Sequence, residues 1–218
     1  MSKRQIIKER RRNRARMSRI LTILAILVVV GLFATFFILN TQGKFPERKI
    51  VDGLTAGDPN APIEVVEYAD FQCPGCQSAF TFLEPEIIKK YINTGKVFYT
   101  FEPFSFVGPE SFRATEAAYC ASDQGKFWDY HDLVFSNWAG ENQGAFSDNN
   151  LIKFASKIDF NQDAFETCFN SGKYTQKVLD KSAEISAAGI TSTPTFKVNG
   201  QVVRSSELLD VLANLAGQ

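Results

Sequence analysis

The motif in this sequence best suited to chemistry is a pair of cysteines two residues apart, Cys73-Pro74-Gly75-Cys76. At this spacing the two sulfurs can close a small disulfide, or one thiol can resolve a mixed disulfide made by the other. If a helix begins at Pro74, the N–H groups and dipole of its first turn stabilise a thiolate at Cys73. Proline suits that first turn because its fixed φ already matches the helix. The motif therefore predicts a dithiol–disulfide centre.

Half of a zinc site is the alternative interpretation of the same pair. A Cys₄ zinc site normally uses a second closely spaced pair of cysteines. The other two cysteines, Cys120 and Cys168, are far apart, and the chain has a single histidine, so we expect no bound metal. In an oxidising compartment two lone cysteines most simply form a structural disulfide, worth about 4 kcal/mol in the chain-entropy model. A second redox-active pair is the alternative for these two residues.

The elements around the motif are those of a mixed α/β sheet. Residues 63–69 (IEVVEYA) are rich in β-branched and aromatic residues and predict a strand just before the cysteines. Residues 77–93 have helical spacing, with a kink expected at Pro85, and residues 96–101 (KVFYTF) predict a second strand. This order is a βαβ unit, whose two strands should be parallel.

The rest of the chain predicts a helical block followed by a hairpin and a helix. Asn199-Gly200 between two β runs is a strong hairpin signal. We expect helices over residues 112–121, 126–138, 149–158, 162–170, 173–188 and 207–215, with strands over 195–198 and 201–203. Candidate N-caps are Asp148 or Asn149, Asn161, and Ser205 or Ser206. The expected fold is therefore a βαβ–ββα mixed sheet with a helical insertion over about residues 111–189.

The N-terminal end predicts a membrane anchor. Residues 1–19 carry nine basic side chains and one acid, whereas the remainder of the chain carries 15 basic and 23 acidic residues. Residues 20–39 (ILTILAILVVVGLFATFFIL) contain no charge, and a helix of about 20 residues crosses the hydrocarbon core of a bilayer. The basic block should stay in the cytoplasm, which places the body outside. A cleaved signal peptide is the alternative, but the apolar run is long for one and lacks a small-residue cleavage site.

The segment after the anchor and the body complete the domain organisation. Residues 40–56 are polar and contain glycine and proline, so we assign them to a linker, and we assign residues 57–218 to one domain. The body is mildly acidic once the N-terminal basic block is set aside, which argues against a nucleic-acid partner.

Three runs of residues resemble the DsbA-like thiol:disulfide oxidoreductases of the thioredoxin superfamily. They are residues 57–62 (GDPNAP), 67–76 (EYADFQCPGC) and 189–196 (GITSTPTF). The resemblance extends from about Gly57 to the C-terminus. It implies a thioredoxin-like fold with a helical insertion, an extracytoplasmic location and no cofactor.

The resemblance also implies a role for each matched residue. Cys73 would be the nucleophile and Cys76 the buried resolving thiol. Thr193-Pro194 matches a loop in which the family carries a cis peptide bond, beside which an extended substrate pairs like an added strand. Glu67 matches a partly buried acid that assists proton transfer at the resolving cysteine. A solvated acid at the end of a strand is the alternative for Glu67.

Three other residues carry weaker expectations. Gly75 stands where the strongest oxidants of the family have histidine, so we expect a less depressed pKa for Cys73 and a less oxidising couple. We expect Asp70 to be structural. We expect His131, in the run FWDYHDLVF, to be a helix-surface or packing residue.

Together these observations predict a membrane-anchored enzyme that introduces disulfides into exported, cysteine-containing proteins. The resemblance implies reoxidation by a membrane quinone-linked partner of the DsbB or VKOR type. A reductase or an isomerase on the same fold is one alternative, although isomerases of this superfamily usually carry a separate dimerisation domain. A non-redox binding module with structural or zinc-bound cysteines is another.

Overall fold

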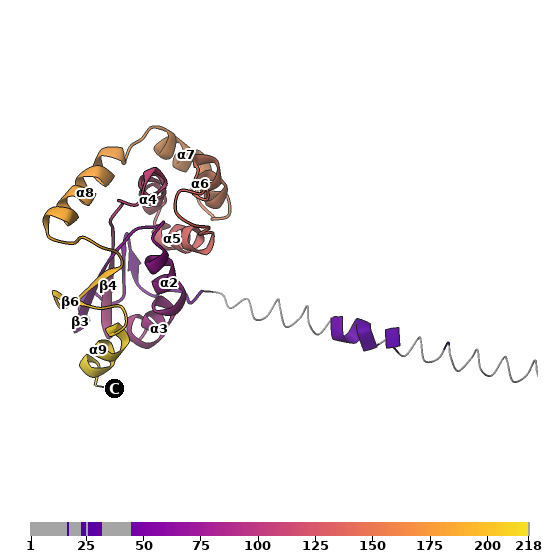
Figure 1. The fold of residues 1–218 in the computed structure, drawn as a ribbon, viewed down its shortest axis with the longest axis horizontal. Helices are drawn as coiled ribbons and strands as arrows, with labels where there is room; N and C mark the ends of the chain where they lie inside the picture. The colour runs from indigo at the N-terminus through magenta and orange to yellow at the C-terminus, as the bar shows by residue number, and fades with distance from the viewer. Residues whose placement is uncertain (1–16, 18–22, 25, 32–44, 218) are drawn as a thin grey trace, which may run out of the picture. The chain divides into compact units, whose positions relative to one another are not determined.

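Figure 1 shows a computed structural model of the chain. It describes residues 45–217 continuously and, nearer the N-terminus, residues 17, 23–24 and 26–31. The chain divides into two units, Met1–Lys44 and Phe45–Gln218. The anchor expected over residues 20–39 lies largely outside the described residues, and no helix within the described part is long and apolar enough to cross a membrane.

A six-stranded mixed sheet forms the centre of the second unit, in the order β1-β2-β4-β3-β5-β6. The central strands β3 (Ile63–Ala69) and β4 (Val97–Pro103) are parallel, as the predicted βαβ unit requires. On the other side of β3, β5 (Thr195–Val198) runs antiparallel to it, and β6 (Gln201–Val203) pairs with β5. The predicted mixed sheet is therefore confirmed.

The hairpin between β5 and β6 turns at Asn199-Gly200. Both residues have positive φ, 49° and 81°, which is the backbone that a type I′ hairpin turn requires. The turn dipeptide thus fixes the register in which β6 continues the sheet.

The N-terminal edge of the sheet lies in a segment that the sequence assigns to a linker. β1 (Val51–Asp52) pairs with β2 (Thr55–Ala56), and β2 pairs with β4. From Phe45 onward, therefore, the segment belongs to the folded unit rather than to a linker over residues 40–56. Strands of two residues leave no periodic pattern in a sequence, which is why this edge was not predicted.

The cysteine motif leads directly into helix α2 (Pro74–Phe82). A short helix α3 (Glu84–Ile87) and a π-helical turn η1 (Ile88–Ile92) follow it. The helix predicted over residues 77–93 is thus broken into three pieces. Pro85 lies in the first turn of α3, where its missing N–H and its ring interrupt the hydrogen bonding of a continuous helix.

Helices α4 to α8 form the inserted subdomain, which lies above the sheet in Figure 1. They are α4 (Pro109–Ser122), α5 (Phe127–Ser136), α6 (Asp148–Ala155), α7 (Gln162–Asn170) and α8 (Thr175–Ala187). The side chain of Asn161 caps α7, as expected, by accepting a hydrogen bond from the N–H of Ala164 at 3.0 Å. Ser147, rather than Asp148 or Asn149, holds the N-cap position of α6.

The C-terminal helix α9 (Leu208–Leu215) matches the predicted segment closely. Its N-cap residue is Glu207, without a side-chain cap hydrogen bond, so neither Ser205 nor Ser206 caps it. Leu208 and Leu212 are fully buried and belong to the main core, which ties the end of the chain to the domain.

An aromatic cluster joins the sheet to the insertion. Phe71, just after β3, and Phe101 of β4 pack with Phe127 and Phe135 of α5, with ring centroids 5.1 to 5.6 Å apart. His131 lies among these rings without solvent exposure, 4.7 Å from the ring of Phe101. It is therefore a packing residue of the core and not a residue of the helix surface.

Candidate active site

The sheet topology brings the cysteine motif and the Thr193-Pro194 loop together. Tyr68 near the end of β3 pairs with Thr195 at the start of β5. Cys73 follows β3 in the chain and Pro194 precedes β5, so the two loops meet at the same end of the sheet. The Sγ atom of Cys73 lies 3.3 Å from the carbonyl oxygen of Thr193. The Thr193–Pro194 peptide bond is cis.

Cys73 is partly exposed at the N-cap of α2, with Pro74 in the first turn. Its pKa is lowered from 9.0 to about 6. A hydrogen bond from the Cys76 thiol is the largest cause of the lowered pKa. Partial burial acts in the opposite direction and raises the pKa. Thr193 and the N–H groups of Gly75 and Cys76 lower it further, so the net effect is a lowered pKa. At neutral pH Cys73 is therefore mostly thiolate, although the motif has no imidazolium.

Gly75 allows the proline loop to approach the start of α2. A Cβ atom at this position would lie only 2.9 Å from Cδ of Pro194 and 3.6 Å from the carbonyl oxygen of Thr193. A side chain between the two cysteines would therefore require the loop or the helix to move.

Cys76 is fully buried, in contrast to Cys73. Burial raises its pKa well above the ordinary value, and the charges of Cys73 and Glu67 raise it further. The two thiols of one motif thus have opposite tendencies: the exposed sulfur is stabilised as an anion and the buried sulfur is stabilised as a thiol.

Glu67 lies on the buried face of β3, where it is 1% exposed and accepts a hydrogen bond from the hydroxyl of Tyr99. Burial raises the pKa of Glu67, and the negative charge of Glu84 adds to this effect. The hydrogen bond from Tyr99 and the charge of Arg48 act in the opposite direction. The structure therefore places Glu67 in the interior, where its charge acts on Cys76, and not at a solvated strand end.

The sequence analysis did not identify three residues that act on this site, which are Tyr99, Arg48 and Glu84. Tyr99 had a partial signal, because it lies in the run KVFYTF that predicts a strand, and the structure places it on the buried face of β4. The two charged residues had none, since Arg and Glu are seldom fully buried unless they are paired.

Asp70 has a structural environment, as expected. Its carboxylate is 1% exposed and accepts hydrogen bonds from four groups. The donors are the N–H of Gln72 at 2.8 Å, the N–H groups of Phe106 and Val107 at 2.9 and 3.0 Å, and the hydroxyl of Ser111 at 2.6 Å. Asp70 thus ties the chain before Cys73 to the loop after β4.

The other two cysteines lie in the inserted helices. Cys120 of α4 and Cys168 of α7 are joined by a disulfide, with a Cα–Cα distance of 5.8 Å. Cys73 and Cys76 are free thiols. Across the described ranges, no group of three or more His, Cys, Asp or Glu side chains is placed to hold a metal ion.

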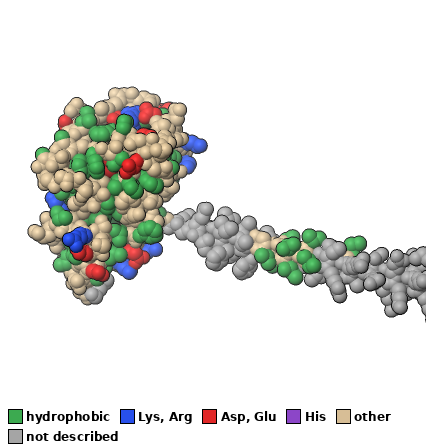
Figure 2. Space-filling model, in the orientation of Figure 1, with side chains coloured by type: hydrophobic (Ala, Val, Ile, Leu, Met, Phe, Trp, Pro, Cys, Tyr) green, Lys and Arg blue, Asp and Glu red, His purple; other side chains and the backbone are tan. Residues whose placement is uncertain are grey.

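Apolar surface lies next to the motif. Gly75, Ser78 and Phe82 line a shallow depression with Ser206, and the Phe82 side chain is 70% exposed. Figure 2 shows that hydrophobic side chains occur among the charged ones on one face of the folded unit.

Comparisons with known proteins agree with this architecture. A family model described as thioredoxin matches residues 49–215. The probable disulfide bond formation protein D of Bacillus cereus is 28% identical over 187 residues, which cover 82% of this chain and 85% of that protein. The crystal structure of α-DsbA1 from Wolbachia pipientis is 28% identical with a TM-score of 0.63, covering 78% of this chain and 94% of that chain.

A different relative is much longer than this chain. The Na(+)/H(+) antiporter NhaA 3 of Salinispora tropica is 31% identical over 147 residues, or 66% of this chain, yet the match spans only 21% of the antiporter. The shared part therefore corresponds to one segment of that protein. The family match, the element order and the cysteine motif agree: the chain belongs to the thioredoxin family and is similar in sequence and fold to DsbA-like proteins.

Proposed function

We propose that this chain is a membrane-anchored enzyme that introduces disulfides into exported proteins through Cys73 and Cys76. The asymmetry of the two thiols carries the proposal. A pKa of about 6 for Cys73 and a raised pKa for Cys76 stabilise the reduced enzyme as a thiolate–thiol pair. A couple whose reduced form is stabilised is a stronger oxidant of other thiols.

The reaction begins from the Cys73–Cys76 disulfide. A substrate thiolate attacks the Cys73 sulfur, the bond between the two enzyme sulfurs breaks, and Cys76 leaves as a thiolate. Because burial disfavours that anion, Cys76 takes up a proton, and the protonated carboxyl group of Glu67 supplies it.

A second substrate thiolate then attacks the substrate sulfur of the mixed disulfide. Cys73 leaves as a thiolate, which its lowered pKa makes a good leaving group. The substrate has lost two electrons and gained a disulfide, and the enzyme has become the dithiol. Two electrons must next pass to a membrane quinone-linked partner of the DsbB or VKOR type.

The substrate chain is held beside the nucleophile by the Thr193-Pro194 loop. An extended peptide pairs with the backbone at Thr193 as an added strand. The 3.3 Å distance between the Thr193 carbonyl oxygen and Cys73 Sγ supports this, because it puts the pairing backbone within reach of the reacting sulfur. The exposed ring of Phe82 offers apolar contact to unfolded chains.

Residues 20–39 anchor the enzyme and residues 1–19 remain in the cytoplasm. Support comes from the uncharged run in the sequence and from the described side chains Ile23, Leu24 and 26–30, which are apolar and 53–62% exposed. Anchoring confines the enzyme and a membrane partner to two dimensions and raises their effective concentration.

The test is catalysis of disulfide formation by the purified full chain in detergent. A reduced, unfolded protein with two cysteines is mixed with catalytic amounts of the chain and with glutathione disulfide. We expect the chain to accelerate oxidation, and Cys73→Ala to abolish the acceleration. A chain that only reduces or reshuffles disulfides would contradict the proposal.

The anchor has a separate test. In intact cells, external protease should digest the body of the chain, and the mature protein should retain its N-terminus. A mature N-terminus near residue 40 would show instead that the apolar run is a cleaved signal peptide.

A further inference from the structure

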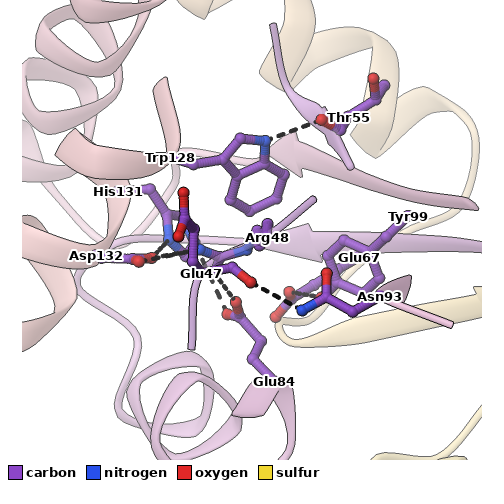
Figure 3. Close-up of polar contacts among 10 residues, drawn as sticks. All are labelled: Glu47, Arg48, Thr55, Glu67, Glu84, Asn93, Tyr99, Trp128, His131 and Asp132. Carbon is purple, nitrogen blue, oxygen red and sulfur yellow. Dashed lines mark hydrogen bonds and ion pairs between the residues drawn. The ribbon is translucent and has the colours of Figure 1, made fainter. Parts of the chain in front are cut away.

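A cluster of charged side chains joins the N-terminal segment of the folded unit to α3 and α5, and the reaction above does not use it. At its centre is Arg48, which is 7% exposed. Nη1 donates hydrogen bonds to both carboxylate oxygens of Asp132, at 2.9 and 3.0 Å, and Nη2 donates to Oε2 of Glu84 at 2.5 Å. The guanidinium group also lies 4.2 Å from the centre of the Trp128 ring. Figure 3 shows Arg48 between these partners.

The segment that carries Arg48 is fixed to the elements of the active site. The ring of Phe45 stacks on Phe80 of α2, the helix that begins at the motif, with centroids 4.4 Å apart. The Asn93 side chain donates to the carbonyl oxygen of Glu47 at 2.9 Å and accepts from the N–H of Lys49 at 2.8 Å. Arg48 is therefore held in place by its backbone as well as by its ion pairs.

Packed side chains connect the cluster to Glu67. The Tyr99 hydroxyl donates to the Glu67 carboxylate, and the Tyr99 ring lies 6.2 Å from the ring of Trp128, over which Arg48 is placed. Phe101, which is opposite Glu67 in the register of β3 and β4, packs against His131 of the cluster, with ring centroids 4.7 Å apart.

His131 and Asp132 of α5 complete the charged surroundings. Nδ1 of His131 lies 2.9 Å from Oδ1 of Asp132, and Nε2 lies 3.8 Å from Oε1 of Glu84. Among the residues that the structure describes, Arg48 is the only buried lysine or arginine. It therefore supplies the fixed positive charge for a set of buried carboxylates that includes Glu67.

We propose that Arg48 is a positioning residue of the dithiol centre, whose charge keeps the buried carboxyl group of Glu67 able to exchange its proton with Cys76. This inference rests on the proposed function. Two carboxylates in a low-dielectric interior, here Glu67 and Glu84, disfavour each other's ionisation, and a buried cation paired with one of them offsets that effect. Without Arg48, Glu67 would bind its proton too tightly to be an effective donor.

The groups that act on Glu67 have opposite signs. The charge of Glu84 raises the pKa of Glu67, as does the charge of Cys73. The charge of Arg48 lowers the pKa of Glu67, as does the hydrogen bond from Tyr99. Arg48→Met and Glu84→Gln should therefore shift the titration of Glu67 in opposite directions. Loss of packing or stability alone would not give opposite shifts.

The experiment is an NMR titration of the full chain in detergent with ¹³C-labelled glutamate carboxyl groups. The Glu67 signal is assigned by its absence in Glu67→Gln. In Arg48→Met we expect the proton affinity of Glu67 to increase about tenfold, which moves the midpoint of its titration to higher pH. In Glu84→Gln we expect it to fall, and in Arg48→Lys, which keeps the charge, we expect it to stay close to that of the wild type.

Arg113→Met is the matched control. Arg113 is a partly buried arginine of the insertion that also binds two carboxylates, Glu116 at 2.6 Å and Asp148 at 2.8 Å. Its replacement should lower stability without moving the midpoint of Glu67.

Equal midpoints in the wild type and Arg48→Met, or shifts of the same sign in Arg48→Met and Glu84→Gln, would overturn the inference. Glu84→Gln leaves the bonds between Arg48 and Asp132 in place, so it tests the sign even if Arg48→Met does not fold. A wild-type chain without oxidase activity in which the midpoints move as expected would refute the proposed function but not the electrostatic role of Arg48.

Discussion

Replacing Cys76 by alanine should make Cys73 a much weaker acid. The pKa of Cys73 is about 6 instead of 9.0, which is about a thousandfold in proton affinity. The hydrogen bond from the Cys76 thiol is the largest cause. We therefore expect its loss to raise the proton affinity of Cys73 about tenfold or more. At pH 7 the thiolate fraction would then fall from about nine-tenths to about one-half or less.

The assay is the rate of alkylation of Cys73 by iodoacetamide between pH 4 and 9, read by mass spectrometry on the reduced full chain. Only the thiolate reacts, so the rate falls as the pH drops below the pKa. The midpoint should lie near pH 6 in the wild type and clearly higher in Cys76→Ala. Cys76→Ser is the control, because its hydroxyl can still donate a hydrogen bond. An unchanged midpoint in Cys76→Ala would refute this reasoning and assign the lowered pKa to the helix N-terminus and Thr193.

Three further substitutions test other parts of the account. Glu67→Gln should slow the release of Cys76 roughly a hundredfold, the contribution typical of a positioned general acid; stopped-flow kinetics with an equal rate would exclude that role. Replacing Cys120 and Cys168 by alanine removes a crosslink between residues that are 48 apart in sequence. Urea denaturation should show a free energy of unfolding lower by about 4 kcal/mol. The alkylation midpoint of Cys73 should not change. Gly75→Ala places a Cβ 2.9 Å from Cδ of Pro194 and should lower the free energy of unfolding by about 1–3 kcal/mol. The NMR chemical shifts of Pro194 should change. Unchanged shifts would show that the site has room for the added methyl group.

The elements that can be predicted from the sequence are those whose structure is determined by neighbouring residues in the chain. The β-branched and aromatic residues of 63–69 predict β3, Pro74 suits the first turn of α2, and Asn199-Gly200 predicts the β5–β6 hairpin. The resemblance to DsbA-like proteins, not the order of the elements, predicts that the Thr193-Pro194 loop lies beside the cysteines, and the structure places the Thr193 carbonyl oxygen 3.3 Å from Cys73 Sγ.

The parts that were missed depend on contacts between distant residues. Arg48 and Asp132 are separated by 84 residues, and Arg48 and Glu84 by 36 residues, so no spacing in the sequence indicates that they pair. The segment with Arg48 has the polar composition of a linker, and its ion pairs and its place beside Trp128 bury it in the fold. The interior position of His131 likewise depends on rings contributed by both the sheet and α5.

The reduction potential of the Cys73–Cys76 couple in the full chain shows directly whether this enzyme oxidises or reduces its substrates. The protein is equilibrated in graded glutathione buffers, and alkylation with mass spectrometry reports each cysteine separately. A strong oxidase has a potential of about −120 mV and thioredoxin about −270 mV. We expect a value toward the first of these, with Cys120 and Cys168 oxidised throughout. A value near or below that of thioredoxin would contradict it and make the chain a reductase.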